Sequence, residues 1–522
     1  MRILRHTTLV ISCLLAAASG VAGGGEDAPS GRLRAVPGLP AGRPLAAGNA
    51  ASKAETEGPA AVSPASHLAE LDRLWRLAAA PLIERADAAG APRLAAEIRS
   101  WPGIASPPAD GRQVIHRIPT STAAPDGLAD GLLPQAVWDD FLEARSAWAD
   151  RVYAAARAAA DDERGCEAFR LLAVALRADP DHPQAREAGG WVRRVDNGVV
   201  VWLWPEAARR QSRREVYSPE FGWLPKTWQP RYAEGLRRQG SRWVPRDDVS
   251  TPRSLADAPV WQSDHWRISQ LADEAEVAAL AARLEDAHMV WWQAFGSFAM
   301  ERGELQRRFD GTHRLQPARS MQAVFFADRQ QYVAALERLE PQIGRTLGIY
   351  WMPTQTAYFF QSDDFQPSTV VHEATHQLFA ESRRTSRLAG EQHGFWALEA
   401  VACYMESLEE TETGWRLGGL DHGRAPAAVE RLTLDNFYVP LEVLCSLGRV
   451  EFQAHPQLPP LYSQISGLAD FFMNGQQGKY REAFVTYLQR IYTGAARPDS
   501  LARLCDADFA QLDAEYRRHL SR

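Results

Sequence analysis

The stretch His372-Glu373-Ala374-Thr375-His376 lies in a segment, residues 370–381, whose pattern predicts a helix. Residues four apart lie one above the other on a helix, so both histidines can reach one tetrahedral Zn²⁺ ion. Glu373 projects beside them and can take a proton from a water molecule. A structural zinc site normally closes its fourth position with Cys or His, whereas a catalytic site keeps that position open.

The residues around this motif indicate that its helix is at least partly buried. Upstream, residues 358–361 (Tyr-Phe-Phe-Gln) predict a short apolar strand, and a loop follows with Ser368 or Thr369 as candidate N-cap. Apolar residues such as Val370 and Leu378 flank the motif. The alternative is a fortuitous motif on a solvated helix face. Two histidines and a glutamate inside a buried helix would be costly without a partner, and a metal supplies one.

A third ligand is expected on the segment Phe395–Glu406, which is rich in Ala, Leu and Met and predicts a second helix. Glu399 is flanked by apolar residues on both sides, and a lone acidic residue in such a run is almost never left unpaired. One interpretation is a salt bridge to an arginine. The other is that Glu399 completes a His₂Glu zinc set with one open position.

These two segments resemble the gluzincin metallopeptidases. That family carries His-Glu-x-x-His, followed by a second helix that reads Trp-x-x-Glu-Gly-x-Ala-x-Tyr. The positions of the second helix that match are Trp396, Glu399, Ala402 and Tyr404. Ala400 replaces the usual Gly, a change that costs little in a helix interior but would tighten packing near the metal.

The sequence His-Glu-Ala-Thr-His-Gln-Leu is similar to that of a narrower bacterial family of secreted gluzincin-like proteins. This resemblance does not indicate a substrate. The resemblance to this family extends from about Trp261 to Leu520. The segments that carry it are an opening strand at His265–Ile268, a long helix at Glu274–Phe295, a strand at Gln322–Phe326, and closing helices at Tyr462–Phe472 and Tyr480–Leu488. The implied fold is α+β: a zincin-like catalytic domain, mainly α, with a small mixed or antiparallel sheet.

The N-terminus has the pattern of an exported protein. Residues 1–22 read as a secretory signal peptide, with two arginines, an apolar run and then small residues. The apolar run is too short to cross a bilayer, which takes about 20 residues. Residues 23–66 are rich in Gly, Pro, Ala and Ser and are expected to be a disordered linker. We therefore expect a secreted or periplasmic protein with no stable membrane span.

Residues 67–198 predict an α-helical region, with helices over His67–Ser100 and Ala136–Arg194 separated by a long loop. Within it, Cys166–His182 resembles the end of a tetratricopeptide helix pair and its turn. A stable repeat array needs about three units, and one is visible, so a plain helical hairpin packed on the next domain is the alternative. These helices are a candidate surface for a protein partner.

Residues 199–260 predict a small Trp- and Gly-rich β module with two or three short hairpins, beginning with the β signal at Val199–Trp204. Tryptophan clusters can bind glycans by stacking, but they more often form the core of a small module, and we favour the core. The metallopeptidase-like domain then covers 261–522. We expect the two halves to separate as domains near Asp257–Gln262.

Charge and cysteine content exclude some classes of function. The 522-residue chain has a formal net charge of −7 and no basic stripe interleaved with aromatic residues, so nucleic acid is not an expected partner. The cysteines after the predicted signal peptide are Cys166, Cys403, Cys445 and Cys505. Their even number permits disulfides in an exported protein, but a domain this large does not need them, and free buried thiols are favoured.

The motif and the resemblance together predict a secreted zinc metallohydrolase, in the first place a peptidase acting on polypeptide or peptide substrates. His372, His376 and Glu399 are the predicted zinc ligands, and Glu373 is the predicted general base. The oxyanion needs a further donor, which in gluzincins is often a Tyr or His well downstream, and Tyr462 is the candidate. Its alternative role is to pack its helix through the ring.

Gluzincins bind peptide backbone along an edge strand above the active-site helix, and Ala357–Gln361 or Gln322–Phe326 could serve. Two other functions stay open. One is an extracellular binding or scaffold protein that retains the fold with little turnover, against which the intact Glu373 argues. The other is a zinc amidase that acts on cell-wall cross-links.

Overall fold

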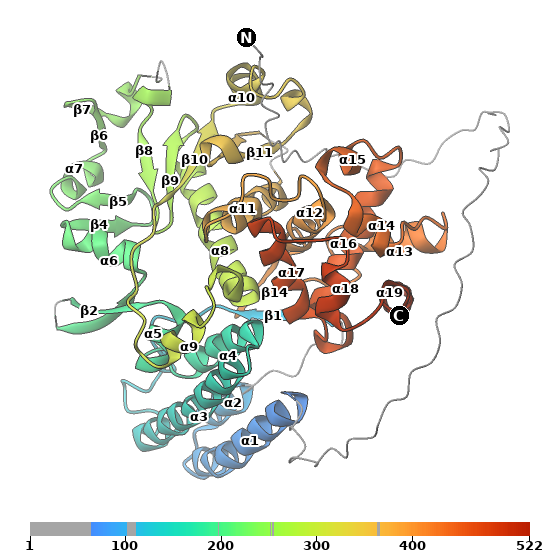
Figure 1. The fold of residues 1–522 in the computed structure, drawn as a ribbon. Helices are drawn as coiled ribbons and strands as arrows, with labels where there is room; N and C mark the ends of the chain where they lie inside the picture. The colour runs from blue at the N-terminus through green and yellow to red at the C-terminus, as the bar shows by residue number, and fades with distance from the viewer. Residues whose placement is uncertain are drawn as a thin grey trace, which may run out of the picture.

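The computed structural model describes residues 64–101, 111–196, 198–250, 252, 255–362 and 366–521 (Figure 1). Helices predominate over several small sheets in these residues, which confirms the predicted α+β class. The predicted signal peptide and residues 23–63 of the predicted linker lie outside the described residues, whereas 64–66 are helical. No described helix is long and apolar enough to cross a membrane.

The N-terminal region is helical, as predicted. Its helices are α1 (Pro64–Ala88), α2 (Pro92–Ser100), α3 (Gln135–Asp161), α4 (Gly165–Ala178) and α5 (Pro183–Gly189). Gly90, with a φ of 70°, and Pro92 divide the first predicted helix into α1 and α2. α3 and α4 pack against each other as a helical hairpin. The predicted helix to Arg194 is wrong at its end, because Gly190 caps α5 with a φ of 112° and a strand begins at Val192.

Three two-stranded hairpins follow in the described residues, in agreement with the prediction of two or three. They are β2 (Val192–Asp196) with β3 (Val199–Leu203), β4 (Glu215–Ser218) with β5 (Gly222–Pro225), and β6 (Leu236–Gln239) with β7 (Arg242–Pro245). The helices between and after them are α6 (Pro205–Ser212), α7 (Gln229–Ala233), η1 (Arg246–Asp248) and η2 (Leu255–Asp257). The first hairpin starts at residue 192, before the predicted start of the β module at 199.

The tryptophans of the later hairpins do not form a buried core. Trp223, Trp228 and Trp243 are all only partly buried, because strands of four residues are too short to enclose an indole on both faces. Arginines also cover two of the rings. Arg238 lies 4.5 Å over Trp228, and Arg231 lies 4.8 Å over Trp243. Aromatic rings of the module do pack together, with the centroids of Trp228 and Trp243 5.6 Å apart, but they stay partly exposed.

A five-stranded mixed sheet forms the framework of the second half. Its strands are β8 (Val260–Gln262), β9 (Trp266–Gln270), β10 (Met321–Phe326), β11 (Gly348–Trp351) and β12 (Thr356–Phe360), in the order β11-β12-β10-β9-β8. β9, β10 and β12 are parallel, and the edge strands β8 and β11 are antiparallel to their neighbours. The proposed substrate strands, Gln322–Phe326 and Ala357–Gln361, form the interior strands β10 and β12, so that prediction is wrong.

Side chains of this sheet alternate between two cores. Ala357 and Phe359 of β12 belong to the main core, together with residues of α8 (Glu274–Ala299) and α11 (Pro367–Glu381). Tyr358 and Phe360 belong to a smaller core with α10 (Arg329–Leu336). Both faces of β12 are therefore buried, which explains its continuous apolar sequence. α11 packs against β11 and β12 at one edge of the sheet.

The remaining helices complete the main core, on the other side of α8 from the hairpins (Figure 1). They include α12 (Phe395–Met405), α13 (Ala425–Thr433), α14 (Leu441–Ser446), α15 (Arg449–Gln453), α16 (Leu458–Asn474), α17 (Arg481–Thr493), α18 (Ser500–Cys505) and α19 (Phe509–Leu520). α9 (Glu304–Phe309) follows α8, and the short turns are η3 (Ile343–Arg345), η4 (Met352–Thr354) and η5 (Gly475–Gln477). The predicted closing helices correspond to α16 and α17. The cysteines at 166, 403, 445 and 505 are free thiols.

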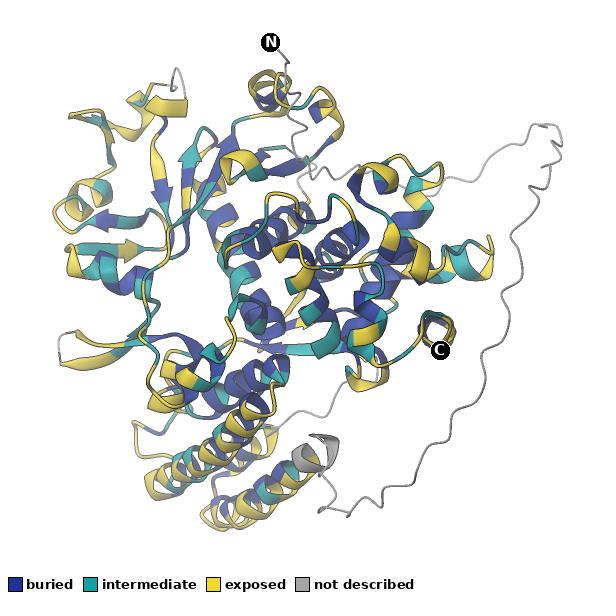
Figure 2. Ribbon diagram, viewed as in Figure 1, coloured by how far each residue is buried: buried dark blue, intermediate teal, exposed yellow. Residues whose placement is uncertain are grey.

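The cores cross the predicted boundary at residues 260/261, and buried residues run through the middle of the molecule (Figure 2). β1 (Gln113–His116), which lies in the predicted long loop, pairs with β14 (Gly414–Leu417), and β13 (Glu409–Thr411) completes that sheet. Ile115 of β1 is buried in the main core. Conversely, Trp292 of α8 packs in the N-terminal cluster and donates to the Gly189 carbonyl at 2.9 Å. Buried contacts therefore join the two halves.

Candidate metal centre

α11, the helix of the His-Glu-x-x-His motif, begins before its predicted N-cap. Pro367 lies in the first turn and Gln366 is the N-cap residue, so the prediction of Ser368 or Thr369 is wrong. Proline suits the first turn because its missing N–H is not needed there. Every residue from Thr369 to Ala380 is buried, which confirms that the motif lies in a buried helix.

The predicted ligands His372 and His376 of α11 and Glu399 of α12 converge on one point. The Nε2 atoms of the two histidines lie 3.1 Å apart. The carboxylate oxygens of Glu399 lie 3.8 Å from His372 Nε2 and 3.7 Å from His376 Nε2. All three residues are at most 1 % exposed. The structure thus brings together residues from two helices that the sequence separates.

A metal ion fits the atoms that face this point. In a tetrahedral site with bonds of about 2.1 Å, ligand atoms lie roughly 3.4 Å apart, and the observed separations of 3.1 to 3.8 Å surround that value. Glu399 Oε1 is buried and accepts no hydrogen bond. Without a cation, this buried carboxylate oxygen would be desolvated and unpaired, which is costly. The group of His372, His376 and Glu399 can therefore bind a metal ion.

A second set of residues, His372 with Cys403 and Glu406, also places ligand atoms near one another. Burial raises the pKa of the Cys403 thiol well above its usual range, and the thiolate is the form that binds a metal. Glu406 lies on the opposite nitrogen of His372, Nδ1, at 2.6 Å. The set with Glu399 is therefore the better candidate to bind a metal ion.

Glu406, which the sequence analysis missed, holds His372 in place. Besides its contact with His372 Nδ1, it accepts from Arg424 at both carboxylate oxygens, at 2.6 and 3.0 Å. Burial opposes the charged form, but these partners outweigh it and hold the pKa of Glu406 below its usual value. A carboxylate on the far nitrogen fixes the imidazole tautomer and leaves Nε2 for a metal. The sequence feature that could have pointed to Glu406 is its position as a second carboxylate at the end of the helix that carries Glu399.

Glu373 lies beside the ligands, with one carboxylate oxygen anchored. The backbone N–H of Tyr350 in β11 donates to Glu373 Oε2 at 2.6 Å, while Oε1 is buried without a hydrogen-bond partner. Burial raises the pKa of Glu373 to about 7. One oxygen is thus fixed and the other can accept a proton. The sequence analysis missed this contact because it did not predict β11, whose signal was the apolar run Gly348–Trp351.

Tyr462 of α16 reaches the same site. Its hydroxyl donates to Glu399 Oε2 at 3.1 Å, and its ring packs against Phe452 with centroids 5.7 Å apart. The hydroxyl therefore lies at the carboxylate of the third ligand. Tyr404, which also matches the gluzincin pattern, points elsewhere, because its hydroxyl donates to Asn474 Oδ1 at 3.0 Å.

Comparison with protein-family models, with curated proteins and with solved structures finds no match for this chain. The functional interpretation therefore rests on the residues and the geometry of the site. The likeness to gluzincins is carried by the residues of α11 and α12.

Proposed function

We propose that this protein is a zinc-dependent metallohydrolase of the gluzincin type, with a zincin-like second half, that hydrolyses the amide bonds of peptides. The observation that supports this function best is the convergence of His372, His376 and Glu399 with Glu373 beside them. Two imidazoles and one carboxylate form the ligand set of several catalytic zinc sites. That donor set favours zinc over harder cations such as magnesium.

Each residue of the site has a distinct part in the proposed reaction. When bound, zinc supplies Lewis-acid chemistry, since it lowers the pKa of water and polarises a carbonyl group. Glu373, with Oε2 fixed by Tyr350, accepts the proton of the attacking water at Oε1 and passes it to the leaving amine nitrogen. Glu406 orients His372. The Tyr462 hydroxyl, which donates to Glu399 Oε2 in the structure, turns its single proton to the oxyanion during the reaction.

β11 is our candidate for the strand that binds substrate. It is the edge strand nearest α11, and the N–H of Tyr350 already contacts Glu373. A peptide that adds to this edge would be positioned by main-chain hydrogen bonds. Its scissile bond would then lie close to the general base.

The complete burial of the site supports a second candidate function. His372, Glu373, His376 and Glu399 are all between 0 and 1 % exposed, as in a metal site that stabilises a fold. The chain would then be an extracytoplasmic binding or scaffold protein with little turnover. A zinc amidase acting on cell-wall cross-links uses the same residues and differs in its substrate.

These functions are separated by assaying the purified mature protein on denatured protein and on peptidoglycan, with and without a chelator. We expect cleavage of denatured protein that the chelator stops and that the Glu373→Gln variant lacks. Cleavage of peptidoglycan alone would favour the amidase. Bound zinc without cleavage of either substrate would favour the binding protein and contradict the proposed activity.

A further inference from the structure

The three hairpins from β2 to β7 concentrate positive charge at one side of the molecule. Residues 192–245 contain eleven Lys and Arg against five Asp and Glu, a formal net charge of +6, whereas the whole chain carries −7. Figure 1 shows these hairpins in one column, on the opposite side of the molecule from α16 and α19. The expectation that the chain has no basic stripe interleaved with aromatic residues is wrong for this segment, where Tyr217, Trp223 and Trp243 lie among the cations. Charge of this sign favours an anionic partner.

The first two hairpins and the segment between them present five exposed cations that form no ion pair within the described residues. Arg193 and Arg194 lie on β2, Arg213 and Arg214 lie between α6 and β4, and Lys226 follows β5. The backbone N–H of Lys226 donates to the Arg214 carbonyl at 2.9 Å, which brings Lys226 beside the second arginine pair. α6 contacts both β3 and β4, so it connects the two hairpins. These charges are available to a partner.

The tip of the first hairpin, residues 195–200, is apolar and exposed. Val195 of β2 and Val200 of β3 form a cross-strand pair, and Val199 is the first residue of β3. Their exposed fractions are 60 %, 37 % and 63 %, and the sheet that holds them has no third strand. Single exposed apolar residues are common on protein surfaces, but three at one tip form a patch typical of an interaction site.

The arginines of β2 lie directly behind this tip. Arg194 is next to Val195 in the strand, and Arg193 is two residues away. A strand rises roughly 3.4 Å per residue, so both arginines lie within about 7 Å of Val195 along the hairpin. Amphipathic elements at a membrane bury their apolar side chains about 5–10 Å into the boundary between headgroups and acyl chains and keep Lys and Arg at the headgroups. The order of apolar tip and basic stem matches that arrangement.

The apolar tip also decides between the anionic partners that the cations attract. Nucleic acids satisfy cations through their phosphates, and their bases stack on aromatic side chains rather than on valines. Acidic polysaccharides offer carboxylates or sulfates but no apolar phase. An anionic lipid surface offers both phosphates for the arginines and acyl chains for the valines.

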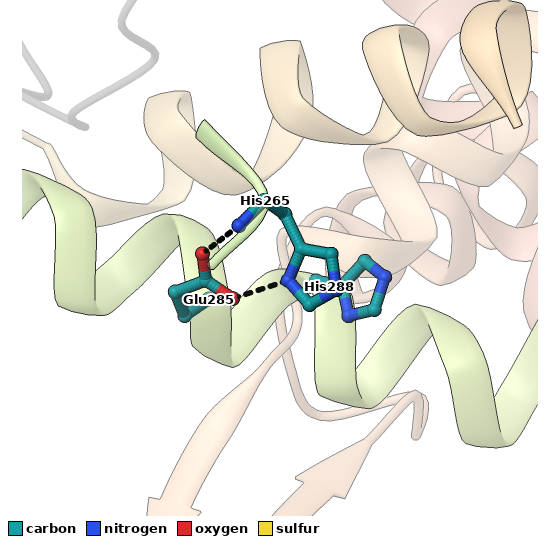
Figure 3. Close-up of side chains that lie close together, drawn as sticks. All are labelled: His265, Glu285 and His288. Carbon is teal, nitrogen blue, oxygen red and sulfur yellow. Dashed lines mark hydrogen bonds and ion pairs between the residues drawn. The ribbon is translucent and has the colours of Figure 1, made fainter. Parts of the chain in front are cut away.

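The hairpins are fastened to the body of the molecule. At the base of the first hairpin, Trp202 packs against the N-terminal helices. In the second, Trp223 of β5 donates to Asp264 Oδ1 at 2.7 Å. The next residue, His265, is held by Glu285 of α8, which accepts from its backbone N–H at 2.9 Å and contacts its Nδ1 at 2.6 Å (Figure 3). A support that is already ordered loses little conformational entropy when it docks.

We propose that the tip of the β2–β3 hairpin and the exposed cations behind it dock this protein on an anionic lipid surface. Val195, Val199 and Val200 enter the boundary between headgroups and acyl chains, and Arg193 and Arg194 contact lipid phosphates. The contact is peripheral and involves one leaflet. It is independent of the proposed hydrolysis, because none of these residues belongs to the metal centre.

Co-sedimentation of the purified mature protein with vesicles tests this surface. The probes are vesicles of phosphatidylcholine and vesicles of an equal mixture of phosphatidylcholine and phosphatidylglycerol. We expect saturable binding to the mixed vesicles that salt weakens, and about tenfold or more weaker binding to phosphatidylcholine alone. Equal binding to both, or no binding to the mixed vesicles, would overturn the proposal. Tighter binding of double-stranded DNA than of the mixed vesicles would assign the cations to nucleic acid and overturn it as well.

A pair of arginine substitutions tests the basic stem. The double variant of Arg193→Gln and Arg194→Gln should bind the mixed vesicles about 25-fold more weakly, about fivefold for each charge removed. The control is Arg490→Gln, an exposed arginine of α17, which should bind as the wild type does. Equal losses in the double variant and the control would show that net charge, and not this hairpin, attracts the protein.

Substitutions in the tip test its insertion. The double variant of Val195→Ser and Val199→Ser should bind about tenfold more weakly, whereas Val450→Ser, whose valine on α15 is 57 % exposed, should bind as the wild type does. Asp196, exposed opposite Val199, is the carboxylate of the described tip, so Asp196→Asn should tighten binding about fivefold. These side chains are exposed, so the fold should not change. Unchanged binding in the valine variant, or weaker binding in Asp196→Asn, would refute insertion of the tip.

Discussion

Glu373 differs from the histidines beside it in how its atoms are held. Its Oε2 is fixed by the N–H of Tyr350 at 2.6 Å, and its Oε1 has no hydrogen-bond partner. A general base needs an oriented lone pair within reach of a water molecule. The Nε2 atoms of His372 and His376 face each other at 3.1 Å instead, an arrangement that suits ligands.

We predict that Glu373→Gln abolishes turnover while zinc remains bound. The amide oxygen can still accept from Tyr350, but the side chain cannot accept a proton from water. The loss should reach at least about 10²–10⁴-fold, the range typical of general acid–base catalysis. Turnover and zinc content of the same preparation check this, with Glu412→Gln, an exposed residue, as control. Wild-type turnover in Glu373→Gln would exclude Glu373 as the base.

We predict that Tyr462→Phe lowers kcat by about 10²–10³-fold and changes KM little, because the oxyanion that its hydroxyl stabilises exists only in the transition state. The ring and its contact with Phe452 remain, so the melting temperature should hardly change. In the structure the hydroxyl donates its single proton to Glu399, a bond that it must exchange for the oxyanion. Zinc affinity must therefore be measured in parallel. Weaker zinc binding with unchanged kcat of the zinc-loaded protein would show that Tyr462 orients the ligand instead.

Glu406 connects three helices around the metal centre. It follows the last residue of α12, contacts His372 of α11, and accepts from Arg424, the N-cap residue of α13. This clamp sets how α11 and α12 present their ligands. We predict that Glu406→Gln weakens zinc binding by about 10–100-fold, as for other residues that orient a ligand. Competition with a chelator measures the affinity.

The control for that variant is Glu409→Gln, a nearby carboxylate whose side chain is 54 % exposed and which pairs with Arg112 outside the metal centre. Its zinc affinity should equal that of the wild type. Equal losses in both variants would indicate a general effect of charge or stability.

The metal site could be predicted from sequence as far as local geometry determines it. His372 and His376 share a helix face because of their spacing, and Glu399 stands out as a carboxylate in an apolar helix. Glu406 and Tyr350 could not be predicted, because their contacts depend on where α12 ends and on which strand lies at the sheet edge. The second carboxylate of the α12 segment and the apolar run of β11 are local signals, but neither shows which residue is contacted.

The helices could be predicted because their signals are local in the sequence, as is the spacing of the two histidines. Several strands could not be predicted in this way. β1 lies in a segment rich in Pro, Gly and Asp and becomes a strand through its pairing with β14, about 300 residues away in the chain. β11 is four residues long and fully buried, so it shows no alternation of polar and apolar residues. The identity of the edge strand follows from the order of all five strands, which the sequence does not reveal.

The two halves of the molecule depend on each other for burial. Gln293 of α8 accepts from the backbone N–H of His116 at 2.9 Å and donates to its carbonyl at 2.7 Å. Trp292 packs among the N-terminal helices, and Ile115 packs in the main core. The domain boundary near residue 260 stays a prediction, and these contacts cross it.

We predict that a fragment starting at Ala258 is markedly less stable than the chain from residue 64 to 521. It loses β1 and exposes Trp292, and exposing one large apolar side chain costs about 1.5–3 kcal/mol. Urea unfolding followed by circular dichroism compares the two. A fragment that unfolds at the same urea concentration as the longer chain would show that the shared contacts contribute little.

The zinc content of the purified protein tests the central claim most directly. Elemental analysis of the wild type should give about one zinc per chain, as expected for a single His₂Glu site. His372→Ala should lose most of it, since the remaining ligands, His376 and Glu399, close only half of a tetrahedral site. Glu373→Gln should retain it. Full zinc occupancy in His372→Ala, or no zinc in wild-type protein supplied with the metal, would contradict the proposed centre.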